Sequence, residues 1–354
     1  MIMVGTMVIA LWVIGWAMKV PRAARWNMTA VLLLAVMIIH VVLPDRHPLR
    51  MNTGGDARLW ALVLGFGLII WGYRRLLAAL RARVPDAAGT TTAEDTPAKS
   101  ATFSDTELNR YARHIVLREI GGPGQKALRD ASVLVIGAGG LGSPALQYLA
   151  AAGVGTIGVI DDDLVENANL QRQVIHSDDN IGLPKVQSAM AAMRAQNPYV
   201  TVRPYHRRLD AQIASELFAD YDLILDGSDN FTTRYLVNET AVALGKPLIA
   251  AALTQWEGQI SLYDPAHHAP CYACVFPQAP DPSLVPSCAE AGVIGPLPGV
   301  IGAMMAVEAI KAITGAGDTL RGRLLIYDAL YAQTRTIAVK PRADCPVCHG
   351  AGAK

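Results

Sequence analysis

Three long apolar runs open the chain. They cover residues 1–18, 28–43 and 59–73, and the first of them contains no charged residue. A helix needs about 20 residues to cross the hydrocarbon core of a bilayer, within a range of about 17–25. The first run reaches this length, and the other two reach it when their flanks join them. We therefore expect a membrane region over residues 1–83 with two or three transmembrane helices; buried core helices for runs two and three, and a signal peptide for run one, are the alternatives.

The hydrophobic pattern changes after this region. Residues 84–102 are rich in Ala, Thr and Pro without apolar periodicity, which predicts a flexible linker. From residue 103 onward, short apolar runs alternate with helix-like stretches such as 143–151 and 185–196. The predicted strands are 133–137, 157–161, 223–227, 247–253, 259–263 and 324–330. This alternation predicts that residues 103–354 form an α/β domain with a Rossmann-like, doubly wound, mainly parallel sheet.

Composition narrows the class of protein. The chain has 354 residues, of which 52% are hydrophobic and 17% charged, below the ~25% charged residues usual in soluble domains. These values exclude a disordered chain or a coiled coil. The formal net charge is +1, from 31 basic and 30 acidic residues, so no global field favours nucleic acid. We expect no nucleic-acid partner.

Basic residues beside the apolar runs predict an orientation in the membrane. Clusters of Lys and Arg follow the first and third runs, whereas the arginines between runs two and three are diluted by Asp, Pro and Gly. With three spans, the two stronger clusters lie on the same side, and positively charged flanks favour the cytoplasm. We expect the chain in the cell (inner) membrane, with the α/β domain of residues 103–354 facing the cytoplasm.

A glycine-rich turn follows the first predicted strand of the α/β domain. Gly137, Gly139 and Gly142 fit the spacing G-x-G-x-x-G, which allows a tight turn and brings phosphate close to backbone N–H groups at a helix N-terminus. Asp161 ends the next predicted strand, where a carboxylate can hydrogen-bond a ribose hydroxyl. The pattern predicts binding of an adenosine nucleotide and, taken alone, leaves NAD open.

Three further residues favour a triphosphate. Arg172 and Lys185 are cations suited to neutralising the negative charge of a triphosphate. The pyrophosphate of a dinucleotide needs fewer cations. Asp229 is a hard oxygen ligand of the kind that holds Mg²⁺ bridging phosphates.

The cysteines divide into two pairs and one single residue. Cys271 with Cys274 and Cys345 with Cys348 are C-x-x-C pairs, and four thiolates make the tetrahedral set of a structural Zn²⁺ site. A redox C-x-x-C is the alternative, but neither pair lies at a strand-to-helix start of thioredoxin type. Cys288 is the fifth cysteine, in a segment between prolines that we expect to be a loop.

With these motifs in hand, the chain resembles the MoeB/ThiF/HesA adenylyltransferases, relatives of ubiquitin-activating enzymes. The resemblance covers roughly residues 104–349 and leaves out the membrane region and linker. It rests on RYARHI (110–115), the glycine-rich segment (137–163), NLQRQ (169–173), GLPK (182–185), DGSDN (226–230), EGQI (257–260), CYAC (271–274), CAEAGV (288–293), PGVIG (298–302) and CPVC (345–348).

The resemblance implies ATP-dependent adenylation of the C-terminal Gly-Gly carboxylate of a ubiquitin-like sulfur-carrier protein, in molybdopterin or thiamine synthesis, with release of pyrophosphate. It also implies ATP, Mg²⁺ and Zn²⁺ as cofactors, and a homodimer. By matching position, Gly140 and its neighbours would hold phosphate and Asp161 the ribose. The remaining implied ligands of the nucleotide and its metal are Asn169, Leu170, Gln171, Arg172, Lys185, Asp229 and Asn230. Arg113 matches an arginine that reaches the ATP of the partner subunit, and Cys288 a cysteine that the thiamine branch uses covalently.

Competing functions make different demands on the sequence. An NAD-dependent oxidoreductase leaves Arg172, Lys185 and Asp229 unexplained, and a relative that activates a tRNA carboxylate calls for a basic surface. A non-catalytic membrane scaffold does not need the intact nucleotide set. No rhodanese domain follows Cys348, so we expect a separate sulfur donor protein.

Overall fold

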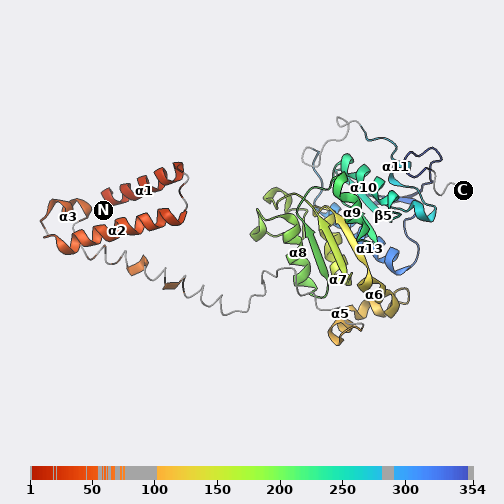
Figure 1. The fold of residues 1–354 in the computed structure, drawn as a ribbon, viewed down its shortest axis with the longest axis horizontal. Coiled ribbons are helices and arrows are strands. Elements are labelled where there is room, and N and C mark those ends of the chain that lie inside the picture. The colour runs from red at the N-terminus through yellow and green to blue at the C-terminus, as the bar shows by residue number, and fades with distance from the viewer. Residues whose placement is uncertain are drawn as a thin grey trace. The chain divides into compact units, whose positions relative to one another are not determined.

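A computed structural model of the chain describes residues 2–18, 20, 22–44, 46–54, 102–280 and 291–349, with a few scattered residues between 58 and 75. The chain divides into two units, Met1–Asp95 and Thr96–Lys354 (Figure 1). Most of the third apolar run, nearly all of the predicted linker and Cys288 lie outside the described residues.

The first unit contains the helices predicted from the first two apolar runs. Helix α1 (Ile2–Ala17) lies beside α2 (Arg22–Val42), and the short helix α3 (Pro48–Thr53) contacts both (Figure 1). Trp12 Nε1 donates a hydrogen bond to Thr29 Oγ1 across this pair, at 3.1 Å. Ala24–Val42 is long and apolar enough to span a membrane, while the apolar part of α1, Met3–Trp16, is shorter.

The second unit is built on one eight-stranded sheet in the order β3-β2-β1-β4-β5-β6-β7-β8. Five strands are parallel: β1 (Ser132–Ile136), β2 (Thr156–Ile160), β3 (Thr201–Tyr205), β4 (Leu223–Asp226) and β5 (Leu248–Leu253). Three more are antiparallel to their neighbours: β6 (Glu257–Tyr263), β7 (Arg323–Asp328) and β8 (Gln333–Ala338). The order reverses direction at β1, between β2 and β4, which is where open α/β sheets bind ligands.

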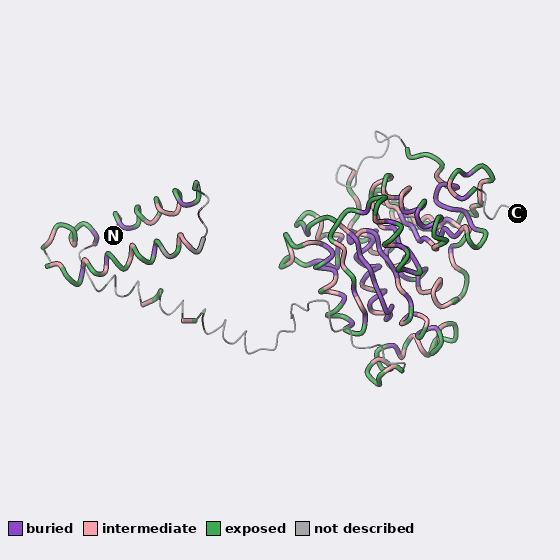
Figure 2. The backbone as a smooth tube through the Cα atoms, viewed as in Figure 1, coloured by how far each residue is buried: buried purple, intermediate pink, exposed green. Residues whose placement is uncertain are grey.

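Helices cover both faces of the parallel strands. One face packs against α6 (Gly121–Asp130), α7 (Gly142–Ala152), α8 (Lys185–Gln196) and α13 (Pro296–Thr314), and the other against α9 (Ala211–Ala219) and α10 (Phe231–Ala243). Alternate residues of β1 enter the two cores: Val133 and Val135 face the first, Leu134 and Ile136 the second. Figure 2 shows this strand region as the buried centre of the unit. Burying each such side chain contributes about 1.5–3 kcal/mol.

The predicted Rossmann-like α/β fold is confirmed, with one qualification about strand direction. The three strands from β6 onward do not follow the parallel pattern of β1–β5. Only residues 254–256 separate β5 from β6, and a parallel crossover needs a dozen or more. A hairpin is therefore the connection that this length allows.

Candidate functional site

The glycine-rich turn joins β1 to α7 at the carboxyl edge of the sheet. Gly137 has a φ of +91°, and a Cβ on Gly142 would lie 1.9 Å from the Gly137 carbonyl oxygen, so both positions require glycine. The backbone N–H groups of Gly139 and Gly140 have no hydrogen-bond partner within the described part of the chain. Free N–H groups at the start of an α-helix form an anion site.

Asp161 follows β2 directly and shapes this turn. Its Oδ2 accepts a hydrogen bond from Ala138 N at 2.7 Å, and its Oδ1 accepts one from Asp163 N at 2.8 Å. Burial raises the pKa of the Asp161 carboxyl above its ordinary value, although Lys185 and the two backbone N–H groups oppose the shift. The residue thus lies at the predicted position, beside the turn, with a structural role in addition to the predicted ribose contact.

The segment 169–173 returns the chain to the turn. It follows the 3₁₀ helix η1 (Asn167–Asn169), and Arg172 Nη2 donates to Asn169 Oδ1 at 2.9 Å. The Cγ of Arg172 is 3.8 Å from the place that a Cβ on Gly140 would take, so this cation borders the turn. Leu170 is half-buried, and the backbone of Gln171 lies against Gly295, the residue before α13.

Lys185 approaches the same region from α8, of which it is the first residue. Its side chain is only 5% exposed, and its Nζ donates to Asp163 Oδ2 at 2.7 Å. An ammonium group has three donors, so this ion pair leaves two for a ligand. The carboxylates of Asp161, Asp162 and Asp163 lie close enough together to hold a metal ion.

The loop between β4 and α10 completes the edge of the site. Asp226, at the end of β4, is buried and its Oδ1 accepts a hydrogen bond from Ser228 N. Asn230 caps α10 by accepting from Thr233 N at 2.8 Å. Asp229 is exposed and has neither a hydrogen bond nor an ion pair within the ranges described. Its carboxylate is therefore available to ligate a metal ion, and the metal role expected from the sequence stays a prediction.

Arg234, in the first turn of α10, contacts this loop and escaped the sequence analysis. It is 6% exposed, and its Nη2 donates to the carbonyl oxygens of Ser228 and, at 2.8 Å, Ala251. Its Nη1 lies 3.8 Å from Asp226 Oδ2. Arg234 thus ties the β4–α10 loop to the end of β5. The one sequence signal was a lone arginine in the first turn of a helix after a buried strand.

Buried polar atoms beside the turn fit a polar ligand. Gln173 Oε1, Asp226 Oδ2 and Ser228 Oγ are buried and lack a hydrogen-bond partner in the described structure. Gln173 Nε2 is the atom nearest the place of a Cβ on Gly139, and Ser228 N lies beside Gly137. Because buried polar atoms are normally hydrogen-bonded, these three mark a place that water or a ligand completes.

Arg113 lies away from this site within its own chain. It is exposed on α5 (Asp105–Ile115), where the neighbouring Arg110 Nη1 donates to the carbonyl of Gln196 at 2.7 Å. Gln196 ends the 12-residue helix α8 that Lys185 begins, so the two ends are about 18 Å apart. The contact of Arg113 with a partner subunit's nucleotide stays a prediction.

The four predicted zinc ligands do come together. Cys271 and Cys274 flank the start of α11 (Tyr272–Val275), and their Sγ atoms are 3.8 Å apart. Cys271 Sγ lies 3.6 Å from Cys345 Sγ, and Cys274 Sγ lies 3.4 Å from Cys348 Sγ. Four sulfurs around a zinc ion with Zn–S bonds of about 2.3 Å are spaced by about 3.8 Å. The cluster is buried and fits a zinc ion.

The surroundings of the cysteines also suit thiolates. The backbone N–H of Arg342 donates to Cys274 Sγ at 3.4 Å. At Cys345, burial tends to raise the pKa, but hydrogen bonds from the backbone N–H groups of Cys348 and Val347 outweigh it and bring the pKa to about 7. Burial raises the pKa of the Cys271 thiol in the absence of a metal.

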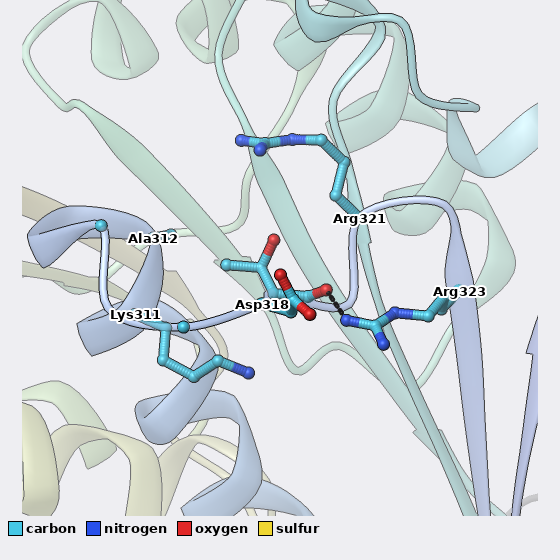
Figure 3. Close-up of a pocket in the computed structure, with 8 residues that line it drawn as sticks. Lys311, Ala312, Asp318, Arg321 and Arg323 are labelled. Carbon is cyan, nitrogen blue, oxygen red and sulfur yellow. Dashed lines mark hydrogen bonds between the residues drawn. The ribbon is translucent and has the colours of Figure 1, made fainter. Parts of the chain in front are cut away.

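A cavity of about 570 Å³ lies elsewhere, between the end of α13 and the start of β7 (Figure 3). Its cations already have partners: Arg321 donates to the buried Asp264, Lys311 pairs with Glu308, and Arg323 donates to the Thr319 carbonyl. Because β7 starts at the amino edge of the sheet, this cavity is separate from the carboxyl edge where the glycine-rich turn lies.

Known proteins share this domain. The family model described as ThiF family matches residues 111–347. A sulfur carrier protein adenylyltransferase of Thermus thermophilus is 51% identical over 250 residues, which are 70% of this chain and 92% of the relative. The SAMP-activating enzyme E1 of Haloferax volcanii is 49% identical over 247 residues, covering 70% and 91%. A probable adenylyltransferase/sulfurtransferase, MoeZ, of Mycobacterium tuberculosis is 49% identical, and the match covers 64% of its length.

Solved structures share the fold. The crystal structure of E. coli MccB with ATP superposes with a TM-score of 0.60 over 69% of this chain and 75% of the other, at 24% identity. The crystal structure of PaaA gives a TM-score of 0.58 at 23% identity. At sequence identities this low, the similarity shows a shared α/β fold.

Proposed function

Because this chain belongs to the ThiF family, we propose that it is an ATP-dependent nucleotidyltransferase that adenylates the C-terminal Gly-Gly carboxylate of a ubiquitin-like sulfur-carrier protein. Two relatives support this proposal: one is named a sulfur carrier protein adenylyltransferase and the other a SAMP-activating enzyme E1. Each is about half identical to this chain, and the match covers about nine-tenths of its length. The observation that carries the proposal is the open glycine-rich turn with Arg172 and Lys185 beside it.

The proposed reaction needs positioning and charge neutralisation more than a protein nucleophile. A carboxylate oxygen of the carrier attacks the α-phosphorus, the bond to the β-phosphate oxygen breaks, and pyrophosphate leaves. The N–H groups of Gly139 and Gly140 would bind phosphate oxygens, and Arg172 and Lys185 would neutralise charge on the leaving pyrophosphate. Sulfur would come from a separate donor protein.

The other residues proposed to bind the nucleotide lie at the same edge of the sheet. Asp161 would contact the ribose, while Asn169 orients Arg172 through their hydrogen bond. Asp229 is the proposed ligand of Mg²⁺, which when bound neutralises charge on the phosphates. Asn230 holds the loop that presents Asp229 by capping α10.

We further propose that the four clustered cysteines hold a structural zinc ion. Their sulfur spacing and burial support this, as does the N–H donor to Cys274 Sγ. A closed set of four thiolates leaves no position for substrate, so the metal would serve stability. Cys288 would stand outside this set.

The first unit supports a membrane location. We propose that α1 and α2 anchor the chain in the inner membrane, with the catalytic unit in the cytoplasm. The length and apolar composition of Ala24–Val42 support the anchor. A homodimer would bring Arg113 of the partner subunit to each nucleotide, which suits the distance between Arg113 and the site of its own chain.

Pyrophosphate exchange tests the function. The full-length protein in detergent is incubated with ATP, labelled pyrophosphate and one of several small carriers ending in Gly-Gly. We expect exchange that depends on a single carrier, which would also identify the pathway. Exchange that needs tRNA instead, or absence of exchange together with tight NAD binding, would overturn the proposal.

A further inference from the structure

His176 links the glycine-rich turn to helix α8. Its ring is 7% exposed, with Nε2 2.9 Å from the carbonyl oxygen of Ala138 and Nδ1 2.9 Å from Ser188 Oγ. Ala138 lies inside the turn, between Gly137 and Gly139, and Ser188 lies one helical turn after Lys185. One buried side chain therefore contacts both elements that border the proposed phosphate site.

The hydrogen bonds assign the tautomer of this ring. A carbonyl oxygen only accepts hydrogen bonds, so Nε2 must carry the proton that it donates to Ala138. Burial lowers the pKa of His176; the bond to Ala138 opposes this shift and the charge of Lys185 adds to it. The ring is thus neutral near pH 7, and Nδ1 accepts from the hydroxyl of Ser188. The same Ser188 oxygen accepts a hydrogen bond from Asn180 Nδ2 at 3.0 Å.

Ala138 is consequently held on both sides. Its N–H donates to Asp161 Oδ2, and its carbonyl oxygen accepts from His176 and, at 3.4 Å, from Ser143 Oγ. The orientation of this residue decides where the following N–H groups, those of Gly139 and Gly140, point. A turn without the His176 contact would lose a buried partner of the Ala138 carbonyl, and such losses are rarely tolerated.

We infer that His176 is a positioning residue for nucleotide binding: its Nε2–H fixes the glycine-rich turn in the orientation that receives phosphate. This inference rests on the proposed function, since it assumes that the turn binds ATP. The residue acts through Ala138 and does not itself touch the ligand. Its link to Ser188 also fixes the helix that carries Lys185.

Two amide substitutions separate the two ring nitrogens. In His176→Gln the side-chain amide can take the place of Nε2 and donate to Ala138, whereas in His176→Asn it takes the place of Nδ1 and reaches only Ser188. His176→Leu removes both contacts. We expect the Kd for ATP, measured calorimetrically on the full-length protein in detergent, to stay within about twofold for His176→Gln. For His176→Asn and His176→Leu we expect it to rise by roughly threefold to tenfold, the effect of one lost hydrogen bond.

The matched control is His206→Gln, which removes an exposed histidine at the same edge of the sheet. We expect it to bind ATP as the unchanged protein does. Normal binding by His176→Asn, or equal weakening in His176→Asn and His176→Gln, would overturn the inference, because the ring would then serve only packing.

Nitrogen NMR on histidine-labelled protein without ATP checks the geometry independently of the reaction. We expect the His176 ring to be the neutral tautomer that carries its proton on Nε2. We also expect this tautomer to persist over the pH range around neutrality. A proton on Nδ1 would contradict the inference even if ATP binds. Lack of ATP binding by the unchanged protein, with the Nε2 tautomer observed, would overturn the proposed function and with it the nucleotide role of His176, and would leave only the contact between His176 and the turn.

Discussion

Asp226, at the end of β4, and Asp229, in the loop that follows, lie three residues apart, but their surroundings differ. Asp226 is 1% exposed and faces the guanidinium of Arg234, whereas Asp229 is exposed and has no partner in the described chain. A buried carboxylate beside a buried cation stabilises the fold, whereas an unpaired exposed carboxylate is available to ligate a metal ion. At the scale of the residue, this difference in burial is why we propose Asp229, and not Asp226, as the metal ligand.

Asp229→Ala is expected to abolish carrier-dependent pyrophosphate exchange, because it removes the proposed Mg²⁺ ligand. Far-ultraviolet circular dichroism and zinc content should stay unchanged. Asp318→Ala, an exposed aspartate at the other edge of the sheet, is the control and should retain exchange. Turnover retained in Asp229→Ala would sink the metal role of this residue.

Arg234→Met should destabilise the fold, since it leaves the Asp226 carboxylate buried without its cation. Removing one partner of a buried pair typically costs about 3–5 kcal/mol, measurable by urea unfolding. The double variant Arg234→Met with Asp226→Asn should recover part of that loss. A single variant as stable as the unchanged protein would show that the pair contributes little.

His176 predicts a pH dependence of stability. Because its folded-state pKa lies below the ordinary histidine value of about 6.5, the unfolded chain binds the proton more readily. The contribution is fully present above that value and is lost as pH falls toward the folded-state pKa. The difference in free energy of unfolding between the unchanged protein and His176→Gln should therefore shrink on acidification from pH 7.5. A difference that is constant with pH would contradict this.

At the scale of the element, sequence patterns predicted what local signals encode. Strands β1, β2 and β4 are continuous apolar runs between helices, and the glycine-rich turn has its own spacing. Strand β3 contains Pro204 and an arginine, and β8 is exposed at every position, so neither has an apolar pattern. Arg234 and His176 also escaped prediction of their roles, because they act on the carbonyls of Ala251 and Ala138, which only the fold brings near.

The cysteine cluster gives a prediction at this scale. Cys274→Ser should release zinc and lower the melting temperature, since a structural metal contributes folding free energy. For a domain of this size, each kcal/mol lost lowers the melting temperature by roughly 2–4 °C. Cys288→Ser is the matched control and should keep both zinc and stability. Zinc-free unchanged protein of normal stability would remove the claim.

At the scale of the whole molecule, the two units differ in what covers their apolar helices. In the second unit α13 is also long and apolar enough to span a membrane, but its Ile301 and Met305 are fully buried against the sheet and its neighbouring helices. In the first unit Trp16, Val31 and Val41 are largely exposed. An outer surface of this kind is suited to lipid, which is why we propose a membrane location for the first unit only.

Val31→Arg with Leu34→Arg should therefore release the full-length protein from washed membranes. Each arginine near the middle of a spanning helix disfavours insertion by about 2.5–3.5 kcal/mol. Both side chains are exposed on α2, outside the small core of this unit. Leu330→Arg, on the catalytic unit, is the control and should stay in the membrane fraction. Equal fractionation of both variants would contradict the anchor.

The two cysteine pairs also order events in time. Cys271 and Cys274 follow β6, whereas Cys345 and Cys348 come after α13, β7 and β8 have been synthesised. During synthesis, two of the four zinc ligands therefore leave the ribosome well before the other two. A nascent chain that ends before Cys345 has only two thiols and lacks the other two ligands of the proposed site. In the proposed zinc form, four-coordinate zinc binding would therefore occur only after every strand of the sheet has been synthesised.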